Sequence, residues 1–398
     1  MRVLLISSAE KGHLNPLVGV AQWLMHDGHQ VGWMTVPEPA DQLEGLGIEV
    51  VALLGAPPAP PLVMGGEALA RLVLDEPALR GWIRALLLDA VPDQIEPVRD
   101  AMHSFRPDVV ALDGMVYQGV LAAHLERIPW AGVSSALTLL EPPEVDSALM
   151  RHVRALAEDR RALFARYGLE ADFRTCECLS PRLNVVFATE ALVGSDARVP
   201  PATVLVGPST PLASRGDESL FPWEKLRCPE RPLVYVSFGS QIYWQPEILR
   251  LLAEAAEPLG IQLVISAGAL AEGNFPASLP GDTIVVPYAP QLALLERAGA
   301  LVSHGGANSV MEAMRDGVPV VQVPICNDQF VQAHFLAKAG AGVVLDRETL
   351  SVEGCRRALR QALDPAGRLR ATARRIRDSY RQRDGAREAA RRIAQLNS

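Results

Sequence analysis

Short apolar runs recur along the whole chain, and stretches with apolar residues at helical spacing separate most of them. A continuous apolar run is typical of a strand that is buried on both faces of a parallel sheet. In the N-terminal half, the predicted strands are Val3–Ser7, Gln30–Thr35, Glu49–Leu53, Val109–Leu112, Trp130–Ser134 and Asn184–Ala188. In the C-terminal half, they are Leu233–Phe238, Gln262–Ser266, Thr283–Val286, Ala300–Ser303 and Val318–Val323. Strands that alternate with helices predict an α/β protein with doubly wound parallel sheets.

The first predicted helix runs from about Pro16 to Asp27 and carries an apolar stripe. Asn15 suits the N-cap position and Pro16 the first helical position, because the side chain of Asn15 can accept a backbone hydrogen bond and a proline loses no needed N–H there. Gly28 suits the position after the C-cap, which favours a left-handed backbone. The next strand then completes a βαβ unit.

The composition changes between the two sets of strands. The segment Gly207–Pro232 is rich in proline, glycine and charge, which is typical of a domain boundary. The sequence therefore predicts a Rossmann-like domain at residues 1–210, a linker at 211–231, a second Rossmann-like domain at 232–380 and a C-terminal helix at 381–398.

Composition and charge describe an ordinary globular protein. The chain has 398 residues, of which 49% are hydrophobic and 21% charged, and its net charge of −8 argues against a nucleic-acid partner. The arginines between Arg356 and Arg392 alternate with apolar residues at helical spacing, so we interpret them as the solvated faces of helices. The five cysteines show no metal-ligand spacing, and their odd number favours free thiols. With no signal-peptide pattern and no apolar run of about 20 residues, we expect a soluble cytoplasmic protein without stable membrane insertion.

A glycine turn in the C-terminal half has the features of an anion site. The predicted strand Ala300–Ser303 leads into His304, Gly305 and Gly306, and a helix begins near Asn308. Glycines let backbone N–H groups approach an anion, and a helix N-terminus adds unpaired donors and about half a positive charge. The motif predicts a diphosphate site.

Polar residues around this turn can extend the site to a nucleotide sugar. Glu312 lies one helical turn beyond Asn308 and can reach a ribose hydroxyl. Asp328 and Gln329 follow the predicted strand Val318–Val323 and can bind sugar hydroxyls. Gly239 frees the backbone after the first strand of this half, and Ser240 can donate to a phosphate. No D-x-D pattern occurs in the chain, so we expect no metal ion and no cofactor besides the nucleotide sugar.

Two polar residues of the N-terminal half are predicted to face the same crevice. His13 lies between the first strand and the first helix, and Asp113 directly follows the strand Val109–Leu112. Ligands of open α/β sheets bind at the carboxyl ends of the strands, and a histidine beside a carboxylate suits a general base. Taken alone, His13 is more typical of a helix-capping or packing residue, and Asp113 of a turn former, than of a catalytic group.

The C-terminal half resembles the donor-binding signature of the family 1 (UDP-dependent) glycosyltransferases. The elements occur in the family's order: Tyr288-Ala289-Pro290-Gln291, His304-Gly305-Gly306-Ala307-Asn308-Ser309, Glu312, Gly317-Val318-Pro319 and Asp328-Gln329. Several elements over some forty positions are far more specific than one glycine motif. The resemblance is to the bacterial type that acts on natural products such as macrolides.

The resemblance implies a GT-B fold, in which two Rossmann-like domains face each other across a cleft. Residues 1–210 would then bind the acceptor and residues 232–380 the donor, and the last helix would return to the first domain. His13 and Asp113 match the family's catalytic base and its partner, which implies displacement with inversion at the anomeric carbon. The matched elements assign donor binding to Gly239, Ser240, Tyr288, Gln291, His304, Gly305, Gly306, Asn308, Ser309, Glu312, Asp328 and Gln329.

The donor base and the acceptor are less constrained. Tyr288 stands where many relatives have a tryptophan that stacks on uracil, so a TDP-sugar is compatible with the sequence; Asn308-Ser309 favours UDP, and Asp328-Gln329 favours glucose. The family suggests a lipophilic small-molecule acceptor. Part of one apolar set could line its pocket, although each member taken singly is more typical of the core: Leu62, Val63, Met64, Trp82, Leu86, Leu87, Met115 and Tyr117.

Three alternatives stay open: a TDP-deoxysugar antibiotic glycosyltransferase, a UDP-sugar epimerase and an inactive auxiliary protein of a glycosyltransferase. A nicotinamide-dependent dehydrogenase is excluded, because the first turn, Ser7–Gly12, lacks the G-x-G-x-x-G pattern. The oligomeric state does not follow from the sequence.

Overall fold

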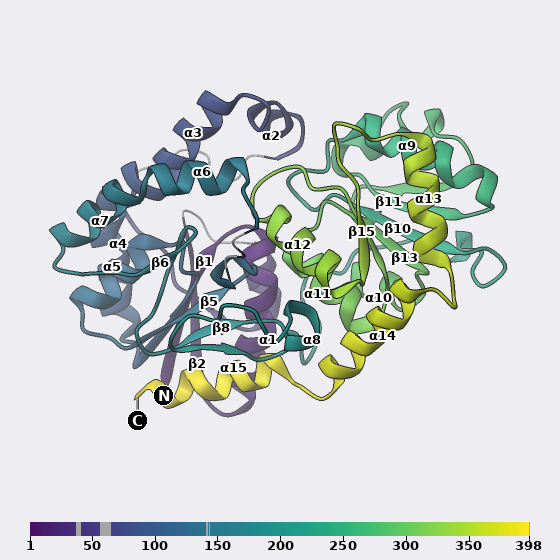
Figure 1. The fold of residues 1–398 in the computed structure, drawn as a ribbon. Coiled ribbons are helices and arrows are strands. Elements are labelled where there is room, and N and C mark those ends of the chain that lie inside the picture. The colour runs from purple at the N-terminus through teal and green to yellow at the C-terminus, as the bar shows by residue number, and fades with distance from the viewer. Residues whose placement is uncertain (37–40, 56–64, 141, 143, 398) are drawn as a thin grey trace.

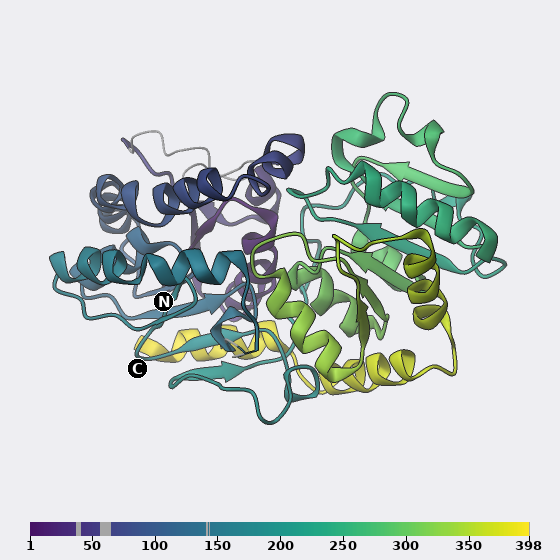
Figure 2. The ribbon, with the colours of Figure 1, turned by 45° about the horizontal axis from the view of Figure 1, so that its top comes forward.

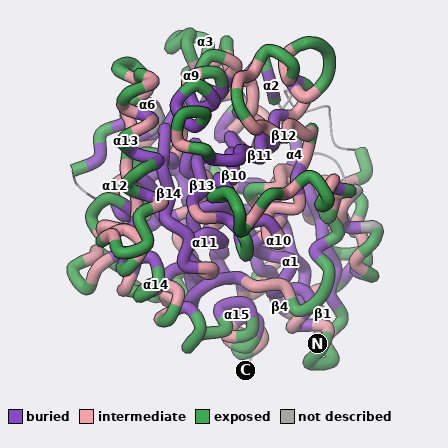
Figure 3. Tube along the Cα trace, turned by 90° about the vertical axis from the view of Figure 1, so that its right-hand side faces the viewer, coloured by how far each residue is buried: buried purple, intermediate pink, exposed green. Residues whose placement is uncertain are grey.

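Two parallel sheets, each flanked by helices, form the core of the molecule (Figure 1). The computed structural model describes all residues except 37–40, 56–64, 141, 143 and 398. The predicted α/β class with two doubly wound sheets is confirmed. Figure 3 shows strands β10, β13 and β14 as buried segments inside the molecule, with exposed positions on the surrounding helices and loops.

The first sheet has the order β3-β2-β1-β4-β5-β8-β9, and all its pairs are parallel. Its strands are β1 (Arg2–Ser8), β2 (Gln30–Val36), β3 (Glu49–Val50), β4 (Val109–Leu112), β5 (Trp130–Ser134), β8 (Asn184–Val186) and β9 (Thr203–Leu205). Its helices are α1 (Lys11–His26), α2 (Gly66–Leu72), α3 (Glu76–Arg84), α4 (Val91–Phe105), α5 (Tyr117–Leu125), α6 (Ala148–Ala155), α7 (Ala157–Arg166) and α8 (Glu190–Val193). A π-helical turn, Ala85–Asp89, joins α3 to α4, and a small antiparallel hairpin pairs β6 (Phe173–Arg174) with β7 (Glu177–Cys178).

The second sheet has the order β12-β11-β10-β13-β14-β15 and is also parallel. Its strands are β10 (Leu233–Ser237), β11 (Gln262–Ser266), β12 (Asp282–Val286), β13 (Ala300–Ser303), β14 (Val320–Gln322) and β15 (Gly342–Val344). Its helices are α9 (Pro246–Ala256), α10 (Gln291–Leu295), α11 (Ala307–Asp316), α12 (Gln329–Ala339), α13 (Val352–Leu363) and α14 (Arg368–Arg381).

The strand order reverses between β1 and β4 in the first sheet and between β10 and β13 in the second. Connections on either side of such a point leave in opposite directions, so a crevice opens at the carboxyl ends of the two strands. His13 lies in the first turn of the helix after β1, Asp113 directly follows β4, and the turns after β10 and β13 carry the glycine motifs. The topology therefore places the predicted base, its partner and the glycine motifs at the two crevices.

The last helix, α15 (Gly385–Ala394), lies with the first domain and packs on α1 (Figures 1 and 2). The contact is made by small residues: a Cβ atom on Gly19 would lie 3.0 Å from that of Ala386. Ala389 and Ile393 are fully buried on the same face. The chain thus crosses from the second sheet back to the first at its end.

The predicted start of the first helix is wrong. Helix α1 begins at Lys11 rather than Pro16, and Asn15 is not its N-cap; Glu10 precedes the first turn. Pro16 is tolerated inside the helix because the N–H that it lacks would have bonded the carbonyl of Gly12. That carbonyl instead accepts a hydrogen bond from Asn308 Nδ2 at 2.9 Å.

Several strand bounds also differ from the prediction. Four predicted strands are shorter than expected: β3 ends at Val50, β8 ends at Val186, β10 ends at Ser237 and β14 spans only Val320–Gln322. The strands β9 and β15 and the β6–β7 hairpin were not predicted, because each strand is only two or three residues long and β9 and β15 are not fully buried. Such short segments give no apolar run that stands out from a loop. No described helix has the length and the apolar character needed to cross a membrane.

Candidate active site

A cleft of about 350 Å³ is lined by residues of both domains. It includes the turns at the carboxyl ends of β1, β10 and β13, as well as the linker between the domains. The predicted site residues that line it are His13, Gly239, Ser240, Tyr288, Gln291, His304, Gly306, Asn308, Ser309, Asp328 and Gln329. Asp113, Gly305 and Glu312 are not among the lining residues, but each contacts or supports one that is.

His13 and Asp113 form a hydrogen-bonded pair at the first crevice. His13 lies in the first turn of α1, and its Nδ1 is bonded to Oδ2 of the buried Asp113. The other Asp113 oxygen accepts the N–H of Met115 at 2.9 Å, which fixes the carboxylate. Burial alone would lower the pKa of His13, but the charge of Asp113 and its hydrogen bond outweigh it and raise that pKa. The pair thus favours an imidazolium beside a carboxylate.

Two further groups touch the His13 ring and were not predicted. Ser135 Oγ lies 3.1 Å from Nδ1, and Glu10 Oε2 lies 3.5 Å from Nε2. Because Nδ1 is engaged by Asp113 and Ser135, Nε2 is the nitrogen that can exchange a proton with a ligand. Ser135 carries no sequence signal, since it is an ordinary loop residue after β5.

The glycine turns of the second domain pack against each other through His304. Gly305 has a φ of +90°, and a Cβ there would lie 1.5 Å from Gln322 Nε2, so only glycine fits. Gly239 also has a positive φ, of +76°. A Cβ there would lie only 2.8 Å from the His304 ring, so the glycine leaves room for this ring. Burial lowers the pKa of His304 to about 4, so the imidazole is neutral at physiological pH.

Helix α11 presents its N-terminus to the cleft, as predicted for the diphosphate site. It begins at Ala307, and Ala307, Asn308 and Ser309 all line the cleft. The Asn308 side chain reaches across to the Gly12 carbonyl of α1. The first turn of α11 therefore faces the first turn of α1, and residues of both turns line the cleft.

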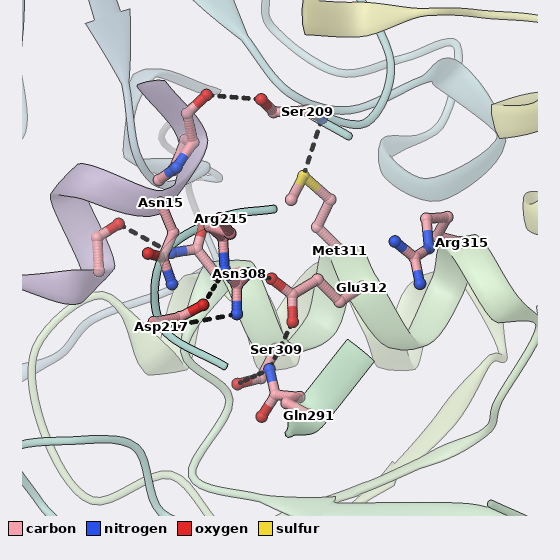
Figure 4. A network of polar contacts seen from close by, with 12 residues as sticks. Asn15, Ser209, Arg215, Asp217, Gln291, Asn308, Ser309, Met311, Glu312 and Arg315 are labelled. Atoms are coloured by element: carbon pink, nitrogen blue, oxygen red, sulfur yellow. Dashed lines mark hydrogen bonds and ion pairs between the residues drawn. The ribbon is translucent and has the colours of Figure 1, made fainter. Parts of the chain in front are cut away.

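A network of ion pairs connects the linker to α11 (Figure 4). Arg215, 5% exposed, donates to Glu312 Oε1 at 2.6 Å and to Asp217 Oδ1 at 2.7 Å. Gln291 Nε2 donates to the other Glu312 oxygen at 2.6 Å. Both carboxylate oxygens of Glu312 are thus bonded within the protein, and the predicted ribose contact would add to these bonds or replace one of them.

Tyr288 is tied to the same network. Its hydroxyl donates to Asp217 Oδ2 at 2.6 Å, and the Lys11 ammonium lies 3.7 Å from the centre of its ring. Burial lowers the pKa of Lys11, the nearby Asp217 carboxylate opposing this. Lys11, Arg215 and Asp217 were missed by sequence reasoning. The charged run at 214–218 inside the predicted linker was a signal for Arg215 and Asp217, whereas Lys11 had none.

Asp328 and Gln329 differ in how their side chains are used. Gln329 is buried, and its Oε1 accepts the N–H groups of Ile325 at 2.8 Å and Cys326 at 3.1 Å, which holds the loop after β14. Asp328 is half-buried and its Oδ2 accepts from Gln332. Burial raises the pKa of Asp328. Of the two, Asp328 has the more open carboxylate for a sugar hydroxyl.

The acceptor side of the cleft is apolar with a polar floor. Trp82, Leu86, Leu87 and Met115 line it, in keeping with the predicted pocket. Tyr117 does not line the cleft. It is fully buried, and its hydroxyl donates to the Cys176 carbonyl, so the expectation that it could line the acceptor pocket is wrong. Leu62, Val63 and Met64 lie outside the described residues. Glu177, which also lines the cleft, was not predicted.

Comparison with known proteins indicates the same class of enzyme as the sequence motifs, the glycosyltransferases. Residues 222–367 match the family model of UDP-glucoronosyl and UDP-glucosyl transferases. The NDP-glycosyltransferase YjiC of Bacillus subtilis is 25% identical over 98% of this chain and 95% of its own length. The oleandomycin glycosyltransferase of Streptomyces antibioticus is 29% identical over 98% of this chain and 89% of its own length.

Solved structures agree on the fold. The glycosyltransferase of kitacinnamycin superposes with a TM-score of 0.75 at 23% identity, covering 99% of this chain and 98% of that one. VinC, a glycosyltransferase solved in complex with DTDP, gives 0.71 at 20% identity, covering 100% of this chain and 99% of that one. Two facing Rossmann-like domains with a diphosphate-type turn thus define an enzyme of the GT-B fold that transfers sugar from a nucleotide sugar. The chain is thus similar to the family 1, UDP-dependent, glycosyltransferases, whose family model matches residues 222–367 and whose relatives align over nearly the whole chain.

Proposed function

We propose that this enzyme transfers a hexose, with UDP-glucose favoured as donor, to a hydroxyl of a lipophilic natural product and inverts the anomeric centre. The observation that carries the proposal is the His13–Asp113 pair, which lies across the cleft from the N-terminus of α11. A proton acceptor thus faces a site suited to a leaving diphosphate. An acceptor bound between them would have its hydroxyl near the base.

His13 acts as the general base in this proposal. Nε2 takes the proton of the acceptor hydroxyl, and the oxygen attacks the anomeric carbon from the face opposite the diphosphate. The bond from that carbon to the phosphate oxygen breaks, and its electron pair leaves with the nucleoside diphosphate. Asp113 stays ionised and balances the imidazolium. Its hydrogen bond to Nδ1 supports this role. A positioned base of this kind contributes on the order of 100- to 10,000-fold in rate.

The donor domain stabilises the leaving diphosphate. The N–H groups of Ala307, Asn308 and Ser309 form the open end of α11, where the helix dipole favours negative charge. Gly239 and Ser240 add donors from the turn after β10, and His304 is neutral and so can donate a hydrogen bond without adding charge. We assign no metal ion to this step. Among the described residues, no group of three or more His, Cys, Asp or Glu is arranged to hold one.

Recognition of the nucleoside falls to Tyr288 and Glu312. The Tyr288 ring lines the cleft and can stack on a base once Lys11 moves from its face. In this proposal Glu312 binds the ribose hydroxyls by exchanging one of its present bonds to Arg215 and Gln291, and Asp328 with Gln329 binds the sugar. The competing assignment is a TDP-deoxysugar donor. It is supported by the tyrosine in place of tryptophan and by the similarity to VinC, whose structure holds DTDP.

The acceptor assignment rests on the apolar wall of the cleft and on the names of similar proteins. Trp82, Leu86, Leu87 and Met115 suit a lipophilic ring system. Relatives include an oleandomycin glycosyltransferase and 4'-demethylrebeccamycin synthase of Lentzea aerocolonigenes. We place the reaction in the cytoplasm, since the cysteines are free thiols, as expected for a reducing compartment.

The test is a transfer assay with UDP-glucose and with TDP-glucose, against a panel of lipophilic alcohols and phenols. We expect acceptor-dependent release of UDP and a β-glucoside product from the α-linked donor. His13→Ala should lower kcat by at least about 100-fold. His26→Ala, at the exposed far end of the same helix, serves as the matched control and should retain full activity.

The outcomes separate the alternatives. Faster turnover of TDP-glucose would favour the TDP-sugar assignment, and an α-linked product would exclude direct displacement. Interconversion of UDP-sugars without an acceptor would indicate an epimerase. A protein that binds neither nucleotide, or that stabilises a second transferase without turning over, would be an auxiliary.

A further inference from the structure

A buried carboxyl on the acceptor wall takes no part in the proposed mechanism. Glu177, in β7, is 4% exposed and lines the cleft with Thr138 and Cys176. The hairpin that carries it is bonded to the loop after Asp113, through the Cys178 N–H and the Gly114 carbonyl at 2.9 Å. A Cβ on Gly114 would lie 3.2 Å from that of Glu177. The hairpin therefore fixes Glu177 next to the His13–Asp113 pair.

Only one oxygen of this carboxyl is used within the described part of the chain. Ser134 Oγ donates to Oε1 at 2.9 Å, and Thr138 Oγ1 donates to the same atom. For Oε2, no hydrogen-bond partner occurs among the described residues, and Oε2 is not one of their fully enclosed unpartnered atoms. Since Glu177 lines the cleft, its otherwise buried carboxyl keeps one accessible acceptor there. Buried carboxyls are normally paired, so an open oxygen at the wall of a ligand cleft points to a ligand group.

The charges around Glu177 indicate which kind of group this is. Burial and then the negative charge of Asp113 raise the pKa of Glu177 to about 8, while the hydroxyls of Thr138 and Ser134 and the charge of His13 act in the opposite direction. Glu10 adds another carboxylate at the far side of the His13 ring. The carboxyl groups of Glu10, Asp113 and Glu177 thus lie around the single His13 imidazole. A ligand cation beside Oε2 would favour the ionised carboxylate.

We propose that Glu177 binds a protonated amine of the acceptor and so selects lipophilic acceptors that carry a basic nitrogen. This inference rests on the proposed function, since it names the acceptor class of that same site. The apolar residues Trp82, Leu86 and Met115 take the ring system, and Glu177 takes the ammonium group. Because Glu177 adjoins the catalytic pair, the amine and the reacting hydroxyl lie on the same side of the acceptor.

Binding of two naphthols that differ in one group tests the proposal without requiring transfer. We would titrate 6-(aminomethyl)-2-naphthol and 6-(hydroxymethyl)-2-naphthol into the UDP-bound protein at pH 7 by calorimetry. The wild type should bind the amine at least about tenfold more tightly, as expected for a charge-assisted hydrogen bond in a buried site. Glu177→Gln keeps the size of the side chain and its bonds to Ser134 and Thr138 but cannot ionise, so the preference should disappear.

The controls separate this result from a loss of fold or of the proposed function. Glu170→Gln removes an exposed carboxylate outside the cleft and should leave the preference unchanged. The wild-type comparison stands even where Glu177→Gln unfolds. A chain without transferase activity could still show the amine preference, so failure of the transfer assay is a separate result. Equal binding of the two naphthols by the wild type, binding of neither, or a preference that survives in Glu177→Gln would overturn the inference.

Discussion

At the scale of single residues, the function depends on how His13 holds its proton. The imidazole must be neutral at Nε2 to accept the acceptor proton, and the Asp113 carboxylate raises the pKa of His13 above 6.5. The competent fraction therefore increases with pH, and the acid limb of the kcat/KM profile should lie above pH 6.5. The same pair stabilises the fold below that pH, and the stabilisation is lost as the pH rises through the raised pKa.

Replacing Asp113 by asparagine should move this limb. Without the carboxylate, burial becomes the dominant influence and lowers the pKa of His13, so the acid limb should shift to lower pH. The maximum of kcat should fall by about 100-fold or more, since the imidazolium loses its counter-charge. The profile of kcat/KM against pH measures both effects, with the exposed Asp100→Asn as control. An unchanged limb would show that Asp113 does not set the protonation of His13.

Sequence reasoning found the site residues that directly follow predicted strands. It missed the residues whose partners lie in the other domain. His13 and Asp113 follow apolar strands, so their shared crevice could be inferred. Arg215 and Lys11 could not be placed, because their partners Glu312 and Tyr288 lie far away in the chain and in another domain. The positions of Ser135 and Glu177 in the site depend on the geometry of a loop and a hairpin, which the periodicity of the sequence does not predict.

At the scale of elements, the turn between β13 and α11 fixes the direction of the anion site. Its backbone needs the left-handed conformation of Gly305, and the side chain of Gln322 fills the space that a Cβ would take. Gly305→Ala should therefore lower the free energy of unfolding by at least about 2 kcal/mol, through backbone strain and overpacking. Chemical denaturation measures the loss. Gly81→Ala, in the open on α3, should cause none, and equal stability of the two variants would contradict this account.

Element ends were the least predictable part of the fold. The sequence placed the start of α1 at Pro16, because a proline is commonest in the first turn. The helix starts at Lys11, and Asn308 of the other domain donates to the Gly12 carbonyl that Pro16 leaves unbonded. That tertiary partner cannot be read from the local sequence, which therefore left His13 in a loop rather than in a helix.

At the scale of the whole molecule, contacts at the cleft, behind α1 and between α8 and the helices α12 and α14 join the two domains. The linker crosses once with Arg215 bonded to Glu312, and the chain crosses again to seat α15 on α1. Because α1 carries His13 at its first turn, the packing of α15 on the opposite part of that helix supports the catalytic residue from behind. The C-terminal helix is therefore part of the scaffold of the site.

A charge placed in the α1–α15 contact tests this role. Ala389 is fully buried there, so Ala389→Glu would bury an unpaired carboxylate and should lower the free energy of unfolding by about 3 kcal/mol or more. If α15 supports α1, donor binding by the second domain should persist while transfer to the acceptor is lost first as temperature rises. Calorimetric titration of UDP beside a transfer assay separates the two. Asn397→Glu adds the same charge at an exposed position just after α15 and should change neither. Loss of UDP binding in step with transfer would mean that α15 stabilises the molecule as one unit rather than the first domain.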